Sequence, residues 1–188
     1  MVEPHYRGPS FLELVESNTP GQPNLVMCIQ CGTCGGSCPS GSDMDHTPRR
    51  LFALIRAGLE EEVLKSNTPW YCVSCYLCMV RCPQDIHITD IMYTLKRMAI
   101  KSGLVTENTA VDWSESFIGY MEDTGRSFEL GLATRHFLKH RPMSLGQTAA
   151  MGWGMMSKGR MEITPTKIEN LGQFQAILKR AKELEAQS

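Results

Sequence analysis

The sequence predicts a mainly α-helical protein built from two small parts. Apolar residues recur at helical spacing in most segments, whereas the alternation that is typical of strands is scarce. All eight cysteines lie in two short frames of one pattern, and the stretch between the frames has helical spacing. The chain therefore divides into residues 1–104, which contain the cysteines, and residues 105–188, which contain none.

The first helix is expected to begin at Ser10, because Ser10 and Glu13 fit a capping box. The first cysteine frame, CIQCGTCGGSCP, follows at residues 28–39. Its glycines let the backbone approach a bound group closely, so that N–H groups can donate to sulfur atoms. The proline that ends the frame fixes φ and turns the chain away.

Two short helices are expected between the frames. Thr47 and Pro48 suit the N-cap and the first residue of a helix that ends at Gly58. The segment LEEEVLK predicts a second helix over Leu59–Lys65.

The second cysteine frame, CVSCYLCMVRCP, occupies residues 72–83 and repeats the spacing of the first. A longer helix is expected after it, with Thr89 or Asp90 as its N-cap and Gly103 at its end. Its apolar residues form one stripe, which predicts a buried face.

The part without cysteines is expected to be a helical extension. Helices are predicted over residues 106–123, 128–139 and 168–186. The segment 143–161 is rich in glycine and contains five methionines. These methionines are either ordinary core residues or an adaptable apolar surface for partner subunits, and both interpretations stay open.

Three kinds of chemistry could use two frames of the form C-x-x-C-x-x-C-x-x-x-C-P. Separate disulfides are disfavoured, because three thiols spaced by two residues are crowded and no export signal is visible. Zinc sites usually take two ligands from each short knuckle, whereas each frame here offers three close thiols and a fourth. The pattern matches bacterial proteins with two iron–sulfur clusters, in which the fourth cysteine of each frame binds the other cluster.

The frames therefore predict two 4Fe–4S clusters with ligands that cross between the frames. The predicted ligands of cluster 1 are Cys28, Cys31, Cys34 and Cys82. The predicted ligands of cluster 2 are Cys72, Cys75, Cys78 and Cys38. This crossing would tie the two frames into one unit.

The second frame carries large apolar residues where the first carries glycines, so we expect it to be drier and to offer fewer N–H donors. The two clusters should therefore differ in reduction potential. Arg49 and Arg81 either offset the negative charge of the clusters or are ordinary solvated residues. The residues expected to exclude water are Leu77, Met79, Val80 and Ile86.

Charge and motifs argue against several classes of function. The formal net charge is −1 and neither half is strongly basic, so we expect no binding to nucleic acid. No apolar run is long enough to span a membrane, and the N-terminus lacks the pattern of a secretory signal, which predicts an intracellular protein. No nucleophile motif, phosphate loop or complete dinucleotide-binding motif is present, so the chain is expected to carry electrons and no catalytic residue is assigned.

The two frames and their helical linker resemble the α-helical ferredoxin domain of succinate dehydrogenase iron–sulfur subunits and their relatives. The whole chain looks most like the family of heterodisulfide reductase C subunits, the small dicluster subunits of methanogens. This resemblance rests on both frames, on DIHITDIMYTLKRMAI after the second frame, and on MGWGMMSKGRMEITPTKI in the tail. It implies an α-helical ferredoxin domain with two 4Fe–4S clusters, followed by a helical C-terminal extension for subunit docking.

The resemblance also implies a function. The C subunits of these complexes relay electrons from the flavin-containing A subunit to the B subunit, which reduces the heterodisulfide of coenzyme M and coenzyme B in methanogenesis. In the cytoplasmic complex, electrons that arrive from a hydrogenase or a formate dehydrogenase undergo bifurcation in the A subunit. The expected partners are therefore the A and B subunits of heterodisulfide reductase, within a larger hetero-oligomer in the cytoplasm.

Three alternatives stay open. The chain could be the relay subunit of a fumarate reductase-like or quinone-interacting complex, although the sequence lacks the plant-type cysteine set and the membrane helices that are usual there. A freely diffusing ferredoxin would not need residues 105–188. A zinc-binding adaptor would be colourless, whereas an iron–sulfur protein is brown.

Overall fold

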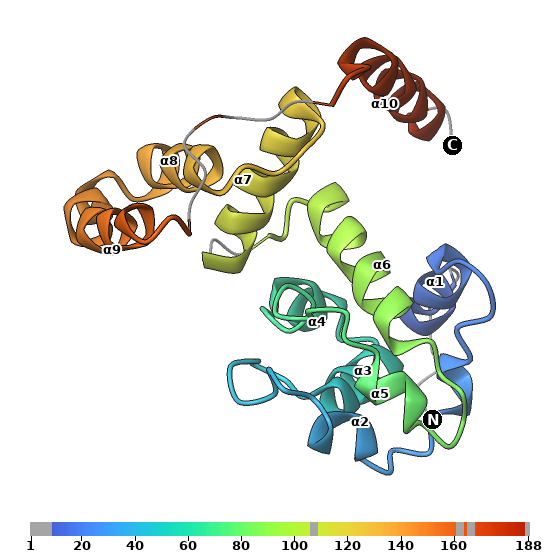
Figure 1. The fold of residues 1–188 in the computed structure, drawn as a ribbon. Coiled ribbons are helices and arrows are strands. Elements are labelled where there is room, and N and C mark those ends of the chain that lie inside the picture. The colour runs from blue at the N-terminus through green and yellow to red at the C-terminus, as the bar shows by residue number, and fades with distance from the viewer. Residues whose placement is uncertain (1–8, 106–108, 161–163, 165–167, 187–188) are drawn as a thin grey trace, which may run out of the picture. The chain divides into compact units, whose positions relative to one another are not determined.

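The fold is seen in a computed structural model, which describes residues 9–105, 109–160, 164 and 168–186 (Figure 1). Every regular element in these ranges is a helix, which confirms the predicted fold class. The chain forms two compact units, residues 1–108 and residues 109–188. We call them unit 1 and unit 2.

Unit 1 contains all eight cysteines. Its elements are α1 (Phe11–Asn18), the 3-10 helix η1 (Leu25–Met27), α2 (Thr33–Gly36), α3 (Pro48–Arg56), α4 (Glu60–Lys65), α5 (Leu77–Val80) and α6 (Ile88–Lys101). The helices α3 and α4 pack against each other between the two frames, and α6 contacts α1, α4 and α5.

Two predicted helix starts are confirmed. At α1, the backbone N–H of Ser10 donates to Glu13 Oε2 at 2.7 Å, and the N–H of Glu13 donates to Ser10 Oγ at 3.3 Å. At α3, Thr47 is the N-cap and Pro48 is the first helical residue. The Thr47 hydroxyl accepts from the N–H of Arg50 at 3.4 Å, so it satisfies one of the donors that a helix start leaves free.

The predicted N-cap of α6 is wrong. The helix begins at Ile88, and its N-cap is His87, whose side chain makes no capping hydrogen bond. Thr89 lies inside the helix, where its buried hydroxyl has no hydrogen-bond partner within the described residues. Ile88 and Thr89 are both 1% exposed, so burial of this turn outweighs the local preference of threonine for a cap.

The core of unit 1 gathers the apolar faces of four helices, as the helical spacing predicts. Residues less than 2% exposed include Val15, Leu51, Phe52, Ile55, Val63, Leu64, Ile91, Met92 and Leu95. Each such side chain stabilises the fold by about 1.5–3 kcal/mol relative to an exposed position. This core supports the two cysteine loops from one side.

Unit 2 contains the helices α7 (Thr109–Thr124), α8 (Glu129–His140), η2 (Pro142–Ser144), α9 (Leu145–Ser157) and α10 (Leu171–Glu185). The first, second and last α-helices lie within or close to the predicted ranges, although residues 106–108 lie outside the described residues. No helix was predicted for the glycine-rich and methionine-rich segment that forms α9.

The helices α7 and α8 pack around a polar pair. Ser116 Oγ and His136 Nδ1 are 3.2 Å apart, and both residues are buried. The ring of Trp113 meets the ring of His136 edge-on, with 4.8 Å between centroids. Burial lowers the pKa of His136, and the neighbouring His140 lowers it further.

We predict that acid weakens the packing of α7 on α8. Because the pKa of His136 is lower in the folded chain than in the unfolded one, its contribution to stability is complete above about pH 6.5 and is lost as the pH falls toward the folded value. Hydrogen exchange of α7 and α8, corrected for intrinsic rates, should rise between pH 7.5 and pH 5.5. A His136→Asn variant should lack this additional rise, and equal pH sensitivity in both proteins would contradict the assignment.

Candidate functional site

Unit 1 has two cavities, and each is lined by four cysteines. Cavity 1 is lined by Cys28, Cys31, Cys34 and Cys82. Cavity 2 is lined by Cys38, Cys72, Cys75 and Cys78. Their empty volumes, part of which is open to solvent, are about 340 Å³ and 380 Å³. Each cavity thus combines three cysteines of one frame with the fourth cysteine of the other.

The thiols line the walls of the cavities. All eight cysteines are free, so no disulfide joins them. In the part of the chain that the structure describes, no three cysteine, histidine or carboxylate side chains come close enough together to hold a single metal ion. Four cysteine thiolates are the usual ligand set of a 4Fe–4S cluster, so the donor chemistry of each cavity fits such a group.

The two cysteine loops have the same backbone path. Gln30 and Gly32 in the first loop have φ values of 59° and 84°, and the corresponding Ser74 and Tyr76 have values of 53° and 62°. Three of these four residues carry a side chain, although the left-handed region favours glycine. The short helices α2 and α5 then follow at the same offset in each frame, and they pack against each other.

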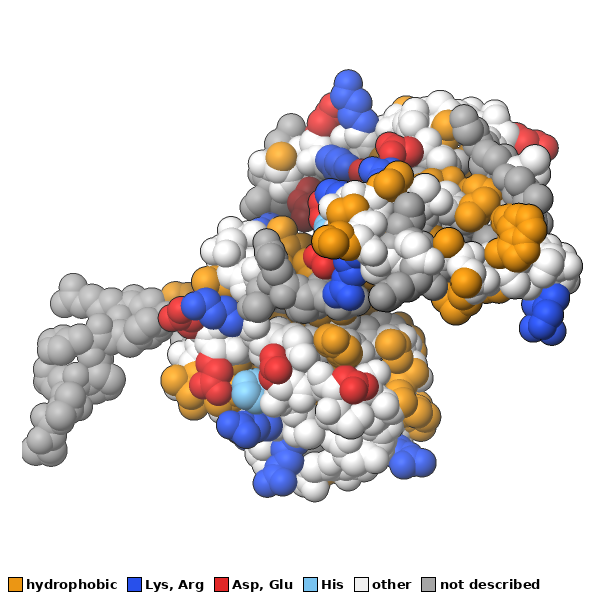
Figure 2. Space-filling model, turned by 90° about the vertical axis from the view of Figure 1, so that its left-hand side faces the viewer, with side chains coloured by type: hydrophobic (Ala, Val, Ile, Leu, Met, Phe, Trp, Pro, Cys, Tyr) orange, Lys and Arg blue, Asp and Glu red, His pale blue; other side chains and the backbone are white. Residues whose placement is uncertain are grey.

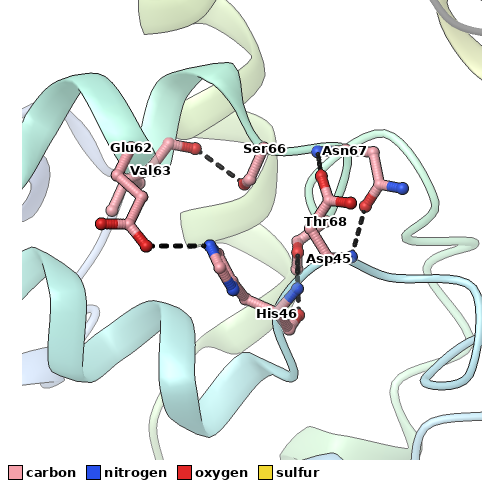
Figure 3. A network of polar contacts seen from close by, with 7 residues as sticks. All are labelled: Asp45, His46, Glu62, Val63, Ser66, Asn67 and Thr68. Carbon is pink, nitrogen blue, oxygen red and sulfur yellow. Dashed lines mark hydrogen bonds and ion pairs between the residues drawn. The ribbon is translucent and has the colours of Figure 1, made fainter.

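A network of polar contacts fixes the segment after the first frame beside the segment before the second (Figure 3). Asp45 N–H donates to Asn67 Oδ1 at 2.7 Å, and Asn67 N–H donates to Asp45 Oδ2 at 2.8 Å. His46 N–H donates to the Thr68 hydroxyl at 3.0 Å, and this hydroxyl donates to the His46 carbonyl at 2.8 Å. Thr68 is fully buried. The network therefore holds one wall of cavity 2 in a defined position.

The same network is anchored on α4. His46 Nε2 lies 3.4 Å from Glu62 Oε1, and the Ser66 hydroxyl donates to the Val63 carbonyl at 2.8 Å (Figure 3). On the other side of the linker, Arg56 of α3 donates to the carbonyls of Val26 and Cys28. The linker helices therefore hold both loops through hydrogen bonds as well as through the core.

Burial and backbone donors act in opposite directions on the thiols. Burial raises the pKa of Cys34 to about 11, while the N–H of Gly35 favours its thiolate. Burial also raises the pKa of Cys78, while its own N–H and that of Met79 lower it. A buried thiol of this kind becomes a stable thiolate when a cation is bound, so cluster binding is expected to release protons.

Cys31 differs from the buried thiols because it is exposed. Hydrogen bonding to the side chain and then to the backbone N–H of Thr33 lowers the pKa of Cys31. The charge of Arg49, which lines cavity 1, acts in the same direction. The proposed role of Arg49 as a compensating charge therefore has a geometric basis, although its side chain is exposed.

Other side chains of the cavities have no counterpart among the predicted site residues. Gln30 Nε2 lies 3.4 Å from Cys28 Sγ, and Met44 Sδ lies 4.0 Å from Cys38 Sγ. The position of Gln30 inside the frame could have suggested its role. Met44 is brought to cavity 2 only by the turn that follows the first frame.

The expectation of a drier second loop is wrong. Val80 is 84% exposed and Leu77 is 45% exposed, because α5 is one turn long and packs only on α2 and α6. Of the residues expected to exclude water, only Ile86 is buried, and Met79 is half-buried. Both loops also place a backbone N–H beside their third thiol, so the expected lack of donors in the second loop is not seen there.

Two of the other residues considered near the frames make contacts at the surface. Arg81 donates to the Ser37 hydroxyl at 3.3 Å, which links the ends of the two frames. His87 Nδ1 lies 3.4 Å from Asp90 Oδ2, next to the start of α6.

Comparison with known proteins agrees with this geometry. Residues 24–86 match the family of 4Fe–4S dicluster domains. Unit 1 therefore contains a dicluster domain, and the prediction of two 4Fe–4S clusters is confirmed.

Among curated proteins, the chain is similar to one kind of subunit. It is 46% identical over 80 residues to the iron–sulfur C 2 subunit of the CoB–CoM heterodisulfide reductase of Methanocaldococcus jannaschii, which covers 43% of this chain and 42% of that protein. It is 38% identical over 85 residues to the C subunit of the H₂:CoB–CoM heterodisulfide,ferredoxin reductase of Methanothermobacter marburgensis, covering 45% and 46%. It is 39% identical over 82 residues to the C subunit of the ferredoxin:CoB–CoM heterodisulfide reductase of Methanosarcina mazei, covering 44% and 50%.

These relatives confirm the predicted resemblance to the C subunits of heterodisulfide reductases. The chain spans about half the length of the curated relatives it matches, or somewhat less. Their names and the dicluster domain indicate an electron-transfer role.

We predict that two neighbouring thiols of cavity 1 react at different rates in the folded, cluster-free chain. Because only the thiolate is nucleophilic, Cys31, with its lowered pKa, should be alkylated at pH 8 well before Cys34, with a pKa of about 11. Timed labelling with iodoacetamide and mass spectrometry of the peptide would measure both rates. In urea the difference should disappear, and equal rates in protein with intact helical circular dichroism would refute the prediction.

Proposed function

We propose that the chain is the electron-relay subunit of a heterodisulfide reductase complex. It would pass electrons from a flavin-containing A subunit to a B subunit that reduces the heterodisulfide of coenzyme M and coenzyme B. The proposal rests on one observation above all. Two cavities with four cysteines each lie in a dicluster domain that is similar to the C subunits of such complexes.

The ligand sets follow the linings of the cavities. Cluster 1 is assigned to Cys28, Cys31, Cys34 and Cys82. Cluster 2 is assigned to Cys38, Cys72, Cys75 and Cys78. The contact between α2 and α5 supports this crossed arrangement, because it brings the end of each frame beside the other loop.

The side chains of the chain hold and surround the clusters. A bound 4Fe–4S cluster accepts and releases single electrons, and its environment sets its potential. The thiolates remain attached, the backbone N–H groups of Thr33, Gly35 and Met79 lie beside sulfur atoms, and Arg49 provides positive charge near cavity 1. These residues position a redox centre, and we assign no acid–base or nucleophilic step to them.

Exposed apolar residues in both units suit a protein that works inside a complex. Val73 and Val80 beside the second frame are 66% and 84% exposed. In unit 2, Met143 is 98% exposed and Trp153 of α9 is 72% exposed. On the face drawn in Figure 2, hydrophobic side chains reach the surface among mixed basic and acidic ones. This exposure favours docking over core packing for the methionine-rich segment, and we assign residues 105–188 to subunit docking.

The wider assembly is part of the same proposal. Its members would be the A and B subunits, with a hydrogenase or a formate dehydrogenase as the electron donor, in the cytoplasm. None of the helices in the described residues combines the length and apolar character that crossing a bilayer requires.

We predict that a Cys82→Ala substitution damages the cluster whose other ligands come from the first frame. The anaerobically isolated variant should lose about half of the eight irons expected for two clusters, and the electron paramagnetic resonance signal of cluster 1 should be lost or altered. Cys38→Ala is the matched control, because it should affect cluster 2 instead. Damage in the Cys82 variant that is confined to cluster 2 would contradict the crossed assignment.

The relay function predicts particular partners. The full-length chain, tagged and isolated without air from its native cells, should be recovered with proteins that resemble the A and B subunits of heterodisulfide reductases. The preparation should be brown, because iron–sulfur clusters absorb visible light. Recovery with a fumarate reductase-like flavoprotein would favour the alternative complex, and a colourless zinc-loaded chain would rule out both.

A further inference from the structure

Lys96 on α6 is held between two aromatic rings next to the second cysteine frame. Its Nζ lies 5.8 Å from the centroid of the Trp70 ring and 5.2 Å from that of the Tyr93 ring, which are cation–π distances. The hydroxyl of Tyr93 is 2.7 Å from Ser74 Oγ, within the second cysteine loop. The ammonium group is thus tied, through one aromatic side chain, to the wall of cavity 2.

This cation has no carboxylate partner among the described residues. Other lysines do have one: Lys65 pairs with Glu61, and Lys182 pairs with Glu122. Lys96 is half-buried, and burial lowers its pKa, while a charged Cys72 acts in the opposite direction. A partly buried cation without an anion is unfavourable, so its position points to a negative group nearby. The cysteines of cavity 2 are the site of that negative group.

We propose that Lys96 is a positioning residue that raises the reduction potential of the cluster bound in cavity 2. This inference rests on the proposed ligand set of that cavity. Reduction adds one negative charge to a cluster, and a nearby fixed cation stabilises the reduced form more than the oxidised form. The aromatic rings keep the ammonium in place, so the charge does not move away when the cluster is oxidised.

Cavity 1 offers an instructive contrast. Its nearby cation, Arg49, is exposed, so salt screens its charge. The charge of Lys96 is screened less because its side chain is half-buried. The two cavities share the backbone path and the number of thiols, so this difference in cations distinguishes their electrostatics.

The test is a redox titration of the anaerobically isolated full chain, followed by electron paramagnetic resonance. The signal of the cavity 2 cluster is first identified as the one that Cys38→Ala abolishes. A Lys96→Met variant, which keeps the length of the side chain, should shift this signal to lower potential and leave the other signal in place. Lys96→Arg should restore the potential, because it keeps the charge between the rings. The shift should persist at high salt, whereas any shift in an Arg49→Gln control should fade.

The outcomes separate this inference from the proposed function. An unchanged potential in Lys96→Met, or equal shifts in both signals, would overturn the role of Lys96 while the two-cluster relay stands. The same shift in Lys96→Arg and Lys96→Met would also overturn it, since packing rather than charge would then be responsible. Iron content and circular dichroism verify folding, and Tyr93→Phe provides a milder variant that should lower the same potential by a smaller amount. A wild-type chain without two cluster signals would overturn the proposed function itself.

Discussion

The crossing of cysteines between two loops is the constraint on which unit 1 depends. Each cavity takes three thiols from one frame and one from the other, so neither cavity can form until both loops are in place. The chain meets this requirement with two helices, α3 and α4, that return it to the starting point, and with the contact between α2 and α5. The paired hydrogen bonds of Asp45 with Asn67 then fix the return.

The cavities are electrostatically prepared for a cationic metal centre. Thiols such as Cys34 are buried, so their charged form is unfavourable until metal binds, while backbone N–H groups already lie beside the sulfur atoms. The surrounding surface is unusually apolar for an isolated protein, with Val80 almost fully exposed. A redox centre close to an apolar surface suits transfer to a docked partner, since electron transfer requires short distances and exclusion of water.

Much of the local structure could be predicted from residues alone. The capping box of Ser10 and the Thr47–Pro48 helix start depend on side chains within four residues, and both occur as predicted. The N-cap of α6 could not be predicted, because burial of Ile88 and Thr89 against the core decides where that helix begins. Leu77 and Val80 were misjudged for a related reason: their exposure depends on which elements cover the single turn of α5.

The sequence by itself determined the chemistry: eight cysteines in two equal frames define the type of cluster and its number, because ligand identity and spacing are local properties. Only the tertiary structure decided the surroundings of that chemistry. It brought Met44 to cavity 2 and placed Lys96 between two rings. These relationships join residues from separate elements, and short-range patterns carry no information on how such elements pack.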